Sequence, residues 1–210
     1  MSEHIRTELS NHILTITLAR PERKNALTQA MYGAMADAVN GANDDKSIRA
    51  IVFTGEGDMF TAGNDLSDFA SIDEREKGTP PVTRFLNAIR DAEKPLIAAV
   101  NGHAIGLGLT LALQCDLRIV ANEGKYGIVQ VRRGVMPDAC SHWTLPRIVG
   151  LERAASLLLT GRKIEGPEAE RLGLALRSVP EEEVLAVATE IARDIAENVA
   201  PLSAAISKRL

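Results

Sequence analysis

Residues 99–121, AVNGHAIGLGLTLALQCDLRIVA, decide how this sequence is interpreted. They form the most apolar run of the chain, yet glycines interrupt it, and glycine inside a helix is unfavourable by about 1 kcal/mol. We therefore expect Gly106-Leu107-Gly108 to form a turn that opens a helix over 107–114. The first N–H groups of a helix have no intrahelical partner, and flanking glycines let a ligand approach them. The glycines alone fit a backbone binding site and a tight helix–strand contact equally well.

Strands and helices alternate on both sides of this stretch. Apolar alternation and short apolar runs predict strands at 12–18, 48–57, 95–100 and 117–120. Helical periodicity predicts one helix that Thr28 caps, a second over 85–92 and a third over 107–114. This order is typical of an α/β fold whose strands are largely parallel.

The second half of the sequence has a different pattern. From about Ser141 onward the strand signals stop, Pro167 stands where a first helical turn would begin, and 181–199 carries an apolar stripe. The members of this stripe are Val184, Leu185, Ala188, Ile191, Ile195 and Val199. We expect residues 1–140 to form an α/β core that holds the site. Residues 141–210 are expected to form a helical region, in the same domain or as an oligomerisation segment, that stops early. Residues 71–81, SIDEREKGTPP, are expected to form a mobile surface loop.

The composition argues against several classes of protein. The 210 residues carry 24 Lys and Arg against 28 Asp and Glu, and only 3% are aromatic, so we expect no nucleic-acid partner. Cys115 and Cys140 lack metal-ligand spacing, and we expect both to be small buried side chains in a reducing, cytoplasmic protein with no metal site. Polar residues interrupt the apolar run at 99–121 and no secretory signal precedes it, so no membrane segment is expected.

A second backbone donor is predicted in FTAGNDL at 60–66, where a strand and turn lead into a helix. There the N–H of Asn64 would face a ligand as the N–H of Leu107 does. Two N–H groups that converge on one oxygen form an oxyanion hole, and each donor is worth about 3 to 4 kcal/mol of transition-state stabilisation. The two segments together predict a site that stabilises a carbonyl oxygen as it gains negative charge.

These segments resemble the crotonase family, the enoyl-CoA hydratases and isomerases. The resemblance runs over LARPERKNAL at 18–27, FTAGNDL at 60–66, VNGHAIGLGLTLALQCDLRIVA at 100–121, YGIVQVRRGVMPD at 126–138 and LPRIVG at 145–150. It implies the crotonase (ClpP-like) fold, in which repeated ββα units form a spiral core followed by a helical C-terminal region. It also implies a homo-oligomer, either a trimer or a dimer of trimers. The implied substrate is an acyl-CoA thioester, so that coenzyme A is part of the substrate and no cofactor is needed.

The resemblance also implies roles for individual residues. The N–H groups of Asn64 and Leu107 would hold the thioester carbonyl. Family members usually have glycine at the position of Leu107, so the pocket beside it should be narrower here. Lys24 would lie near the CoA phosphates. The other implied substrate-binding residues are Ala26, Ala62, Asp65, Leu66, Ser67, Gln130 and, packed or lining the acyl pocket, Trp143.

The residue that moves a proton is the remaining question. Family hydratases use two glutamates, and this sequence has Thr110 and Gln130 at their positions, neither of which is a base at neutral pH. Family isomerases use one carboxylate further on, and Asp138 falls at that position. His142 would be an accessory residue if a helix has already begun at Asp138. From the local sequence alone, Asp138 serves equally well as the N-cap of a helix near Ser141.

Three functions are open at this point. The first and favoured one is an enoyl-CoA isomerase with Asp138 as its single acid/base. The second is a hydratase, or a hydrolase of carbon–carbon or carbon–halogen bonds that uses Asp138 with His142. The third is an acyl-CoA binder without catalytic activity. The sequence leaves the identity of the acyl chain open in all three.

Overall fold

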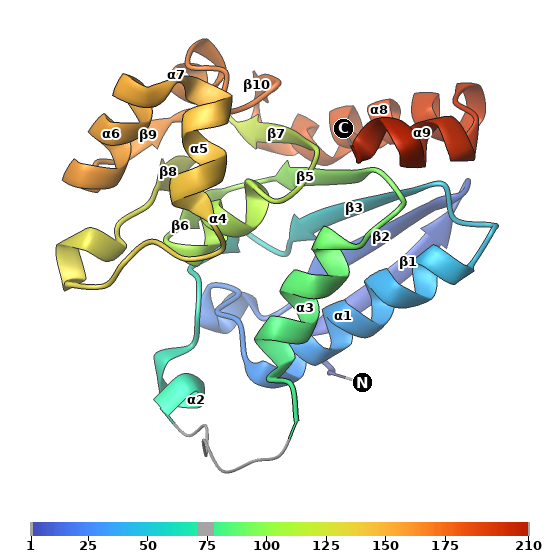
Figure 1. Cartoon of the computed structure of the whole chain (residues 1–210), viewed down its shortest axis with the longest axis horizontal. Helices are drawn as coiled ribbons and strands as arrows, with labels where there is room; N and C mark the ends of the chain where they lie inside the picture. Colours follow the sequence, from blue (N-terminus) through green and yellow to red (C-terminus); the bar gives the residue numbers. More distant parts are fainter. Residues whose placement is uncertain (1, 71–77, 210) are drawn as a thin grey trace.

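The structure is a computed structural model that describes residues 2–70 and 78–209 (Figure 1). The described part of the chain forms a larger and a smaller β-sheet with helices packed around them. The larger sheet has the order β1-β2-β3-β5-β7-β10, in which β1 is antiparallel to β2 and all other neighbours are parallel. Its strands are β1 (Ile5–Ser10), β2 (Ile13–Leu18), β3 (Ala50–Gly55), β5 (Leu96–Val100), β7 (Leu117–Ala121) and β10 (Arg177–Val179).

The smaller sheet has the order β4-β6-β8-β9, with β9 antiparallel to β8. Its strands are β4 (Met59–Thr61), β6 (His103–Ile105), β8 (Lys125–Gly127) and β9 (Ile164–Glu165). The α-helices are α1 (Gln29–Asp44), α2 (Leu66–Ala70), α3 (Pro81–Arg90), α4 (Leu107–Ala112), α5 (Ser141–Val149), α6 (Leu151–Thr160), α7 (Gly166–Arg171), α8 (Val184–Asn198) and α9 (Pro201–Lys208). Three 3₁₀ turns are η1 (Pro21–Arg23), η2 (Gln130–Arg133) and η3 (Glu181–Glu183).

Both faces of the larger sheet are covered, and its central strands β3 and β5 are buried at nearly every position. In β3, Ile51 and Phe53 join the cluster that includes side chains of α1 and α3. Ala50 and Val52, on the opposite face, pack in the second cluster with α8. Figure 1 shows α1 and α3 on one side of the sheet and α8 on the other. The α/β fold expected from the alternating elements is confirmed.

The predicted N-terminal elements are confirmed with small shifts of their ends. The four expected strands correspond to β2, β3, β5 and β7, and the three expected helices to α1, α3 and α4. Thr28 is the N-cap of α1, and its Oγ1 accepts a hydrogen bond from the N–H of Met31 at 3.2 Å. Residues 71–77 of the expected mobile loop lie outside the described residues, and Pro81 is the first residue of α3.

The expectation that strands stop after Ser141 was wrong. β9 pairs with β8 and β10 pairs with β7, so the later half of the chain completes both sheets. Pro167 does lie in the first turn of α7, as predicted. The predicted stripe on α8 is confirmed at Val184 and Ala188, which are buried, and at Ile191 and Ile195, which pack on the sheet while partly exposed. Leu185 and Val199 are exposed instead, and the alanines at 192 and 196 are buried.

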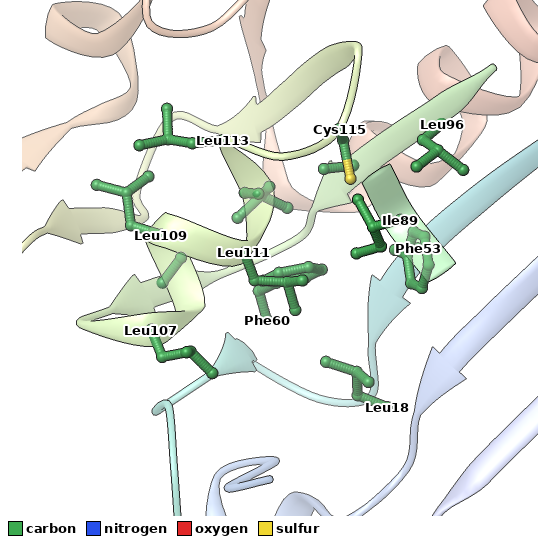
Figure 2. Close-up of a cluster of buried hydrophobic side chains, with 14 of the residues drawn as sticks. Leu18, Phe53, Phe60, Ile89, Leu96, Leu107, Leu109, Leu111, Leu113 and Cys115 are labelled. Atoms are coloured by element: carbon green, nitrogen blue, oxygen red, sulfur yellow. The ribbon is translucent and has the colours of Figure 1, made fainter. Parts of the chain in front are cut away.

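Helix α4 packs between the two sheets and carries many of the core side chains. Leu107, Leu109, Leu111 and Leu113 lie in one hydrophobic cluster with Phe60 of β4 (Figure 2). A Cβ on Gly108 would lie only 2.4 Å from the carbonyl oxygen of Thr61, so glycine alone lets α4 approach β4 this closely. Within the described residues, none of the helices is both long enough and apolar enough to span a bilayer.

Candidate active site

The turn after β4 and the turn before α4 lie against each other. Gly63 has φ of +97°, and a Cβ on it would be 3.5 Å from the backbone nitrogen of Leu107 and 3.2 Å from the carbonyl oxygen of Ile105. A side chain at position 63 would therefore be strained and crowded at once. The tight fit places Asn64, the next residue, beside Leu107.

Most backbone N–H groups around these turns donate to an acceptor, but those of Asn64 and Leu107 have no acceptor among the described residues. Leu27 N–H donates to Gly63 O at 2.8 Å, Asp65 N–H donates to Leu27 O at 2.9 Å, and Gly106 N–H donates to the carbonyl oxygen of the last residue of β8 at 2.8 Å. Among residues 2–70 and 78–209, none accepts a hydrogen bond from the N–H of Asn64 or Leu107. Both groups are therefore available as donors to a ligand, on two adjoining turns.

The side chain of Leu107 packs into the protein interior. It is 7% exposed and belongs to the hydrophobic cluster around Phe60 (Figure 2). Its Cβ would lie 3.7 Å from a Cβ on Gly63. The Leu107 side chain thus lies in the core, and the N–H of this residue has no acceptor among the described residues.

Three separate segments bring their polar side chains together at Asp138. Thr110 on α4 places its Oγ1 2.5 Å from Asp138 Oδ1, and Gln130 in η2 donates from Nε2 to the same oxygen at 3.1 Å. Thr110 is fully buried, while Gln130 and Asp138 are half-buried. Within the described chain, no donor lies within hydrogen-bond distance of the second oxygen, Oδ2. The carboxylate of Asp138 is therefore anchored through Oδ1, and Oδ2 has no donor among the described residues.

Asp138 is not the N-cap of α5. The N-cap is Cys140, whose side chain makes no capping hydrogen bond, and Asp138 contributes only its carbonyl oxygen, which accepts from Ser141 N–H at 2.9 Å. Ala139 and Cys140 have φ of 45° and 54°, a left-handed conformation that costs non-glycine residues about 1 to 2 kcal/mol each. Gln114 Nε2 supports this turn by donating to Ala139 O at 2.6 Å. The turn directs the carboxylate toward α4 rather than toward its own helix.

Tyr32 on α1 is a site residue that the sequence did not reveal. It is buried, and its hydroxyl donates to Asn64 Oδ1 at 2.6 Å. Burial raises the pKa of this hydroxyl well above its ordinary value, and the negative charge of Asp138 raises the pKa further. Tyr32 therefore stays protonated, and it lies close enough to Asp138 to feel its charge. A polar hydroxyl on the apolar face of a helix was the only signal in the sequence.

The expected CoA-binding loop is built on a second residue that the sequence did not reveal. Asn25 is fully buried with φ of 52°, and its side-chain nitrogen donates to the carbonyl oxygens of Glu56 and Met59 at 2.9 and 2.8 Å. Next to it, the carbonyl oxygen of Lys24 accepts from Ala62 N–H at 3.0 Å, while the lysine side chain is exposed. The loop is thereby fixed to the turn that precedes Asn64.

The carboxylate of Asp65, which was expected to bind substrate, forms hydrogen bonds to other residues of the chain. Its Oδ1 accepts from Ser67 N–H and Oγ at the start of α2, and its Oδ2 accepts from Arg20 Nη1 at 2.7 Å. The Ser67 hydroxyl and then the Arg20 guanidinium hold the pKa of this carboxyl well below its usual value. Arg20 also donates to the carbonyl oxygen of Ala26 at 3.0 Å, and Leu66 is exposed beside them. Asp65 thus ties the first loop to α2.

The structure does not bring His142 and Trp143 to the carboxylate by any hydrogen bond among the described residues. His142 is exposed, and because α5 begins at Ser141, it does not share a helix face with Asp138. Trp143 is also exposed, and the guanidinium of Arg147 lies 3.6 Å from the centre of its ring. Cys115 is buried as expected, but the same expectation for Cys140 was wrong, because Cys140 is exposed.

The described residues hold no cluster of three or more His, Cys, Asp or Glu side chains that could bind a metal ion. The described groups at this site are the backbone N–H groups of Asn64 and Leu107, the carboxylate of Asp138 and the hydroxyl and amide groups around it.

Comparison with known proteins shows the family of this chain. Residues 8–210 match the family model described as enoyl-CoA hydratase/isomerase. The chain is 37% identical to the enoyl-CoA hydratase ACTT3 of Alternaria alternata over 201 residues, which is 94% of this chain and 68% of that protein. It is 35% identical to the 1,2-epoxyphenylacetyl-CoA isomerase of Escherichia coli over 205 residues, which is 93% of this chain and 77% of that protein.

A solved structure agrees over nearly the full length. The enoyl-CoA hydratase/isomerase of Pseudoalteromonas atlantica superimposes with a TM-score of 0.94 at 42% sequence identity, covering 99% of this chain and 82% of that one. A family model across almost the whole sequence and a shared fold at this level of identity lead to one assignment. The chain belongs to the enoyl-CoA hydratase/isomerase family and has the crotonase fold.

Proposed function

We propose that this protein is an acyl-CoA isomerase that moves a carbon–carbon double bond, with Asp138 as its single acid/base. The thioester carbonyl oxygen accepts hydrogen bonds from the N–H groups of Asn64 and Leu107. The observation that carries the proposal is the pair of hydrogen bonds from Thr110 and Gln130 to one oxygen of Asp138. They leave the other carboxylate oxygen as the only group of the three that can take up a proton at neutral pH.

The reaction needs one proton to be moved between two carbon atoms. Asp138 Oδ2 removes a proton from carbon 2 of a 3-enoyl-CoA, and the electron pair of that C–H bond becomes part of a dienolate. The negative charge on the thioester oxygen is stabilised by the two backbone donors, each worth about 3 to 4 kcal/mol. Asp138 then returns the proton to carbon 4, and the double bond lies between carbons 2 and 3.

The neighbours of Asp138 argue against hydration by two glutamates. Hydration needs one group to activate water and another to supply a proton, and Thr110 and Gln130 occupy the positions where family hydratases have those carboxylates. In this chain both side chains instead donate to Asp138. A hydrolase that pairs Asp138 with His142 gains no support either, because His142 is exposed on α5. The names of the relatives include both hydratases and an isomerase.

The substitution Asp138→Asn tests the proposal, because the asparagine Oδ1 can accept the same two hydrogen bonds. We expect the isomerisation of 3-hexenoyl-CoA to fall by about 10²- to 10⁴-fold, the usual contribution of an acid/base group. The affinity for hexanoyl-CoA should stay within a few-fold of wild type. The conjugated 2-enoyl thioester is followed by its ultraviolet absorbance. Asp37→Asn on the exposed side of α1 is a matched control that should behave as wild type.

Three outcomes contradict the proposal. Unchanged turnover in Asp138→Asn removes the assigned role. Rapid conversion of 2-hexenoyl-CoA to the 3-hydroxy ester by the wild-type protein, detected by mass spectrometry, makes it a hydratase. Tight binding of CoA esters with neither double-bond migration nor exchange of their α-protons in deuterated water makes it a binding protein.

We also propose that the protein assembles from several copies of the chain. Large apolar side chains are more than half exposed along the stretch from the end of η2 to α6, and solvent is a poor environment for such a group. These side chains are Val135, Met136, Trp143, Leu151 and Leu159. Sedimentation equilibrium should give the mass of three or six chains, and the mass of one chain would contradict the proposal.

A further inference from the structure

The Asn64 side chain has no part in the proton transfer, which uses only the backbone N–H of this residue. Its amide oxygen accepts from the Tyr32 hydroxyl at 2.6 Å, so one end of the amide is fixed. Among the residues that the structure describes, none accepts a hydrogen bond from the other end, Nδ2. Asn64 is half-buried, so an acyl group that covers it would remove water from this NH₂ group.

Burying an N–H donor without giving it an acceptor costs free energy. A ligand that covers Asn64 but has no acceptor for its Nδ2 group therefore binds more weakly. A saturated alkyl chain over Asn64 Nδ2 would leave its N–H groups without an acceptor. An acyl chain that carries an oxygen acceptor would replace the lost water. Sites with a few fixed polar groups select ligands in this way, and analogues that lack the matching group are strongly rejected.

Tyr32 fixes which end of the amide faces the ligand. Because its hydroxyl remains protonated, it donates to the amide oxygen, and Asn64 must present its NH₂ group elsewhere. Tyr32 also lies near enough to Asp138 for the carboxylate charge to raise the pKa of its hydroxyl. A second negative charge on the ligand would therefore be repelled here, which favours a neutral acceptor such as a ketone over a carboxylate.

We propose that the Asn64 side-chain amide, oriented by Tyr32, binds a keto oxygen on the acyl chain, so that oxoacyl-CoA esters are the preferred substrate class. This inference rests on the proposed function, because it assumes that an acyl-CoA occupies the site. Asn64 then has two roles. Its backbone N–H binds the thioester oxygen, and its side-chain amide donates a hydrogen bond to the keto oxygen of the acyl group. Tyr32 is a positioning residue that acts through Asn64.

The test compares the affinities of the full chain for hexanoyl-CoA, 3-oxohexanoyl-CoA, 5-oxohexanoyl-CoA and adipoyl-CoA by calorimetry. We expect the wild-type protein to bind the better oxo ester at least about tenfold more tightly than hexanoyl-CoA, the effect of one buried hydrogen bond. Adipoyl-CoA, which ends in a carboxylate, should bind no better than hexanoyl-CoA. Tyr32→Phe should reduce the ratio of the oxo-ester affinity to the hexanoyl-CoA affinity to less than about threefold.

Two further variants separate this role from a loss of stability. Asn64→Leu keeps the backbone N–H but removes the side-chain amide, and it should abolish the preference for the oxo esters. Tyr126→Phe is the matched control, since Tyr126 is also buried and its hydroxyl donates to a backbone carbonyl, that of Ala121, at 2.7 Å. It should lose a similar amount of stability and keep the preference.

The outcomes distinguish this inference from the proposed function, because binding is measured without turnover. Equal affinities of the wild-type protein for hexanoyl-CoA and both oxo esters would overturn the inference alone, as would an unchanged preference in Tyr32→Phe. Failure of every CoA ester to bind would overturn both. A preference that is lost in Tyr32→Phe and Asn64→Leu but kept in Tyr126→Phe supports the inference.

Discussion

Replacing Thr110 with valine tests whether Asp138 is positioned by its neighbours. Valine has the shape of threonine without the hydroxyl, so it removes the hydrogen bond of 2.5 Å to Asp138 Oδ1 and fills the same buried space. A hydrogen bond to a charged group contributes about 1.5 to 3 kcal/mol. At 1.36 kcal/mol for each factor of ten in rate, its loss corresponds to about 10- to 150-fold. Gln130 still holds the same oxygen, so we expect kcat for 3-hexenoyl-CoA to fall by about 10- to 50-fold.

The assay is the ultraviolet measurement of 2-enoyl-CoA formation, with kcat and KM determined separately. KM should change less than about threefold, since Thr110 is fully buried and acts through Asp138. Thr110→Ser, which keeps a hydroxyl, should recover most of the activity. In a protein that already carries Asp138→Asn, the valine substitution should have no further effect. A kcat within twofold of wild type, or an equal loss in the Asp138→Asn background, would refute the positioning role.

Two further predictions concern stability. Gly108→Ala places a methyl group 2.4 Å from a backbone oxygen of β4 and should lower the midpoint of thermal unfolding strongly. Gly33→Ala, whose methyl group meets nothing within 4 Å, should stabilise α1 by about 0.5 to 1 kcal/mol, and equal midpoints for the two variants would contradict this. Because Ser67 and Arg20 lower the pKa of Asp65 in the folded state, its stabilising effect is complete above the unfolded pKa near 4 and is lost as pH falls below it. Wild type should therefore lose stability below about pH 4 more steeply than Asp65→Asn, as measured by thermal unfolding.

The elements that the sequence predicted well are those whose signals are local. β3 begins with four consecutive apolar residues, and Thr28 caps α1 through a hydrogen bond to a residue three positions away. β4, β6, β8 and β9 are two or three residues long, and their hydrogen bonds come from partners far along the chain, so no periodicity could reveal them. β1 lies at the sheet edge with mostly exposed side chains and therefore has no apolar alternation.

Helix α8 shows how an apolar pattern can find the right face of a helix and still miss some of its buried positions. The sequence pattern placed the large apolar residue Leu185 on the buried stripe, but its side chain is exposed. Three of the four buried positions of α8 are alanines, whose small side chains allow the helix to approach the strands closely, while Ile191 and Ile195 pack beside them. A hydrophobicity pattern does not indicate which positions need a small side chain to fit against the sheet.

The site divides in the same way. The two backbone donors followed from glycine-containing turns, but the grouping of Thr110, Gln130 and Asp138 followed from the family resemblance, since these residues are up to 28 positions apart. The bond between Tyr32 and Asn64 joins residues 32 positions apart and has no sequence signature. Such contacts depend on how α1 and β4 are placed in space, which only the folded chain defines.

The anchoring of Asp138 through one carboxyl oxygen has a stereochemical consequence. If only the second oxygen exchanges a proton, both carbon atoms must turn the same side of the acyl chain toward it. Double-bond migration would then be suprafacial, and a deuterium atom removed from one carbon would reappear on the same side of the other before it could be washed out by water. The position of the deuterium in each product molecule would therefore identify which hydrogen was removed from its substrate.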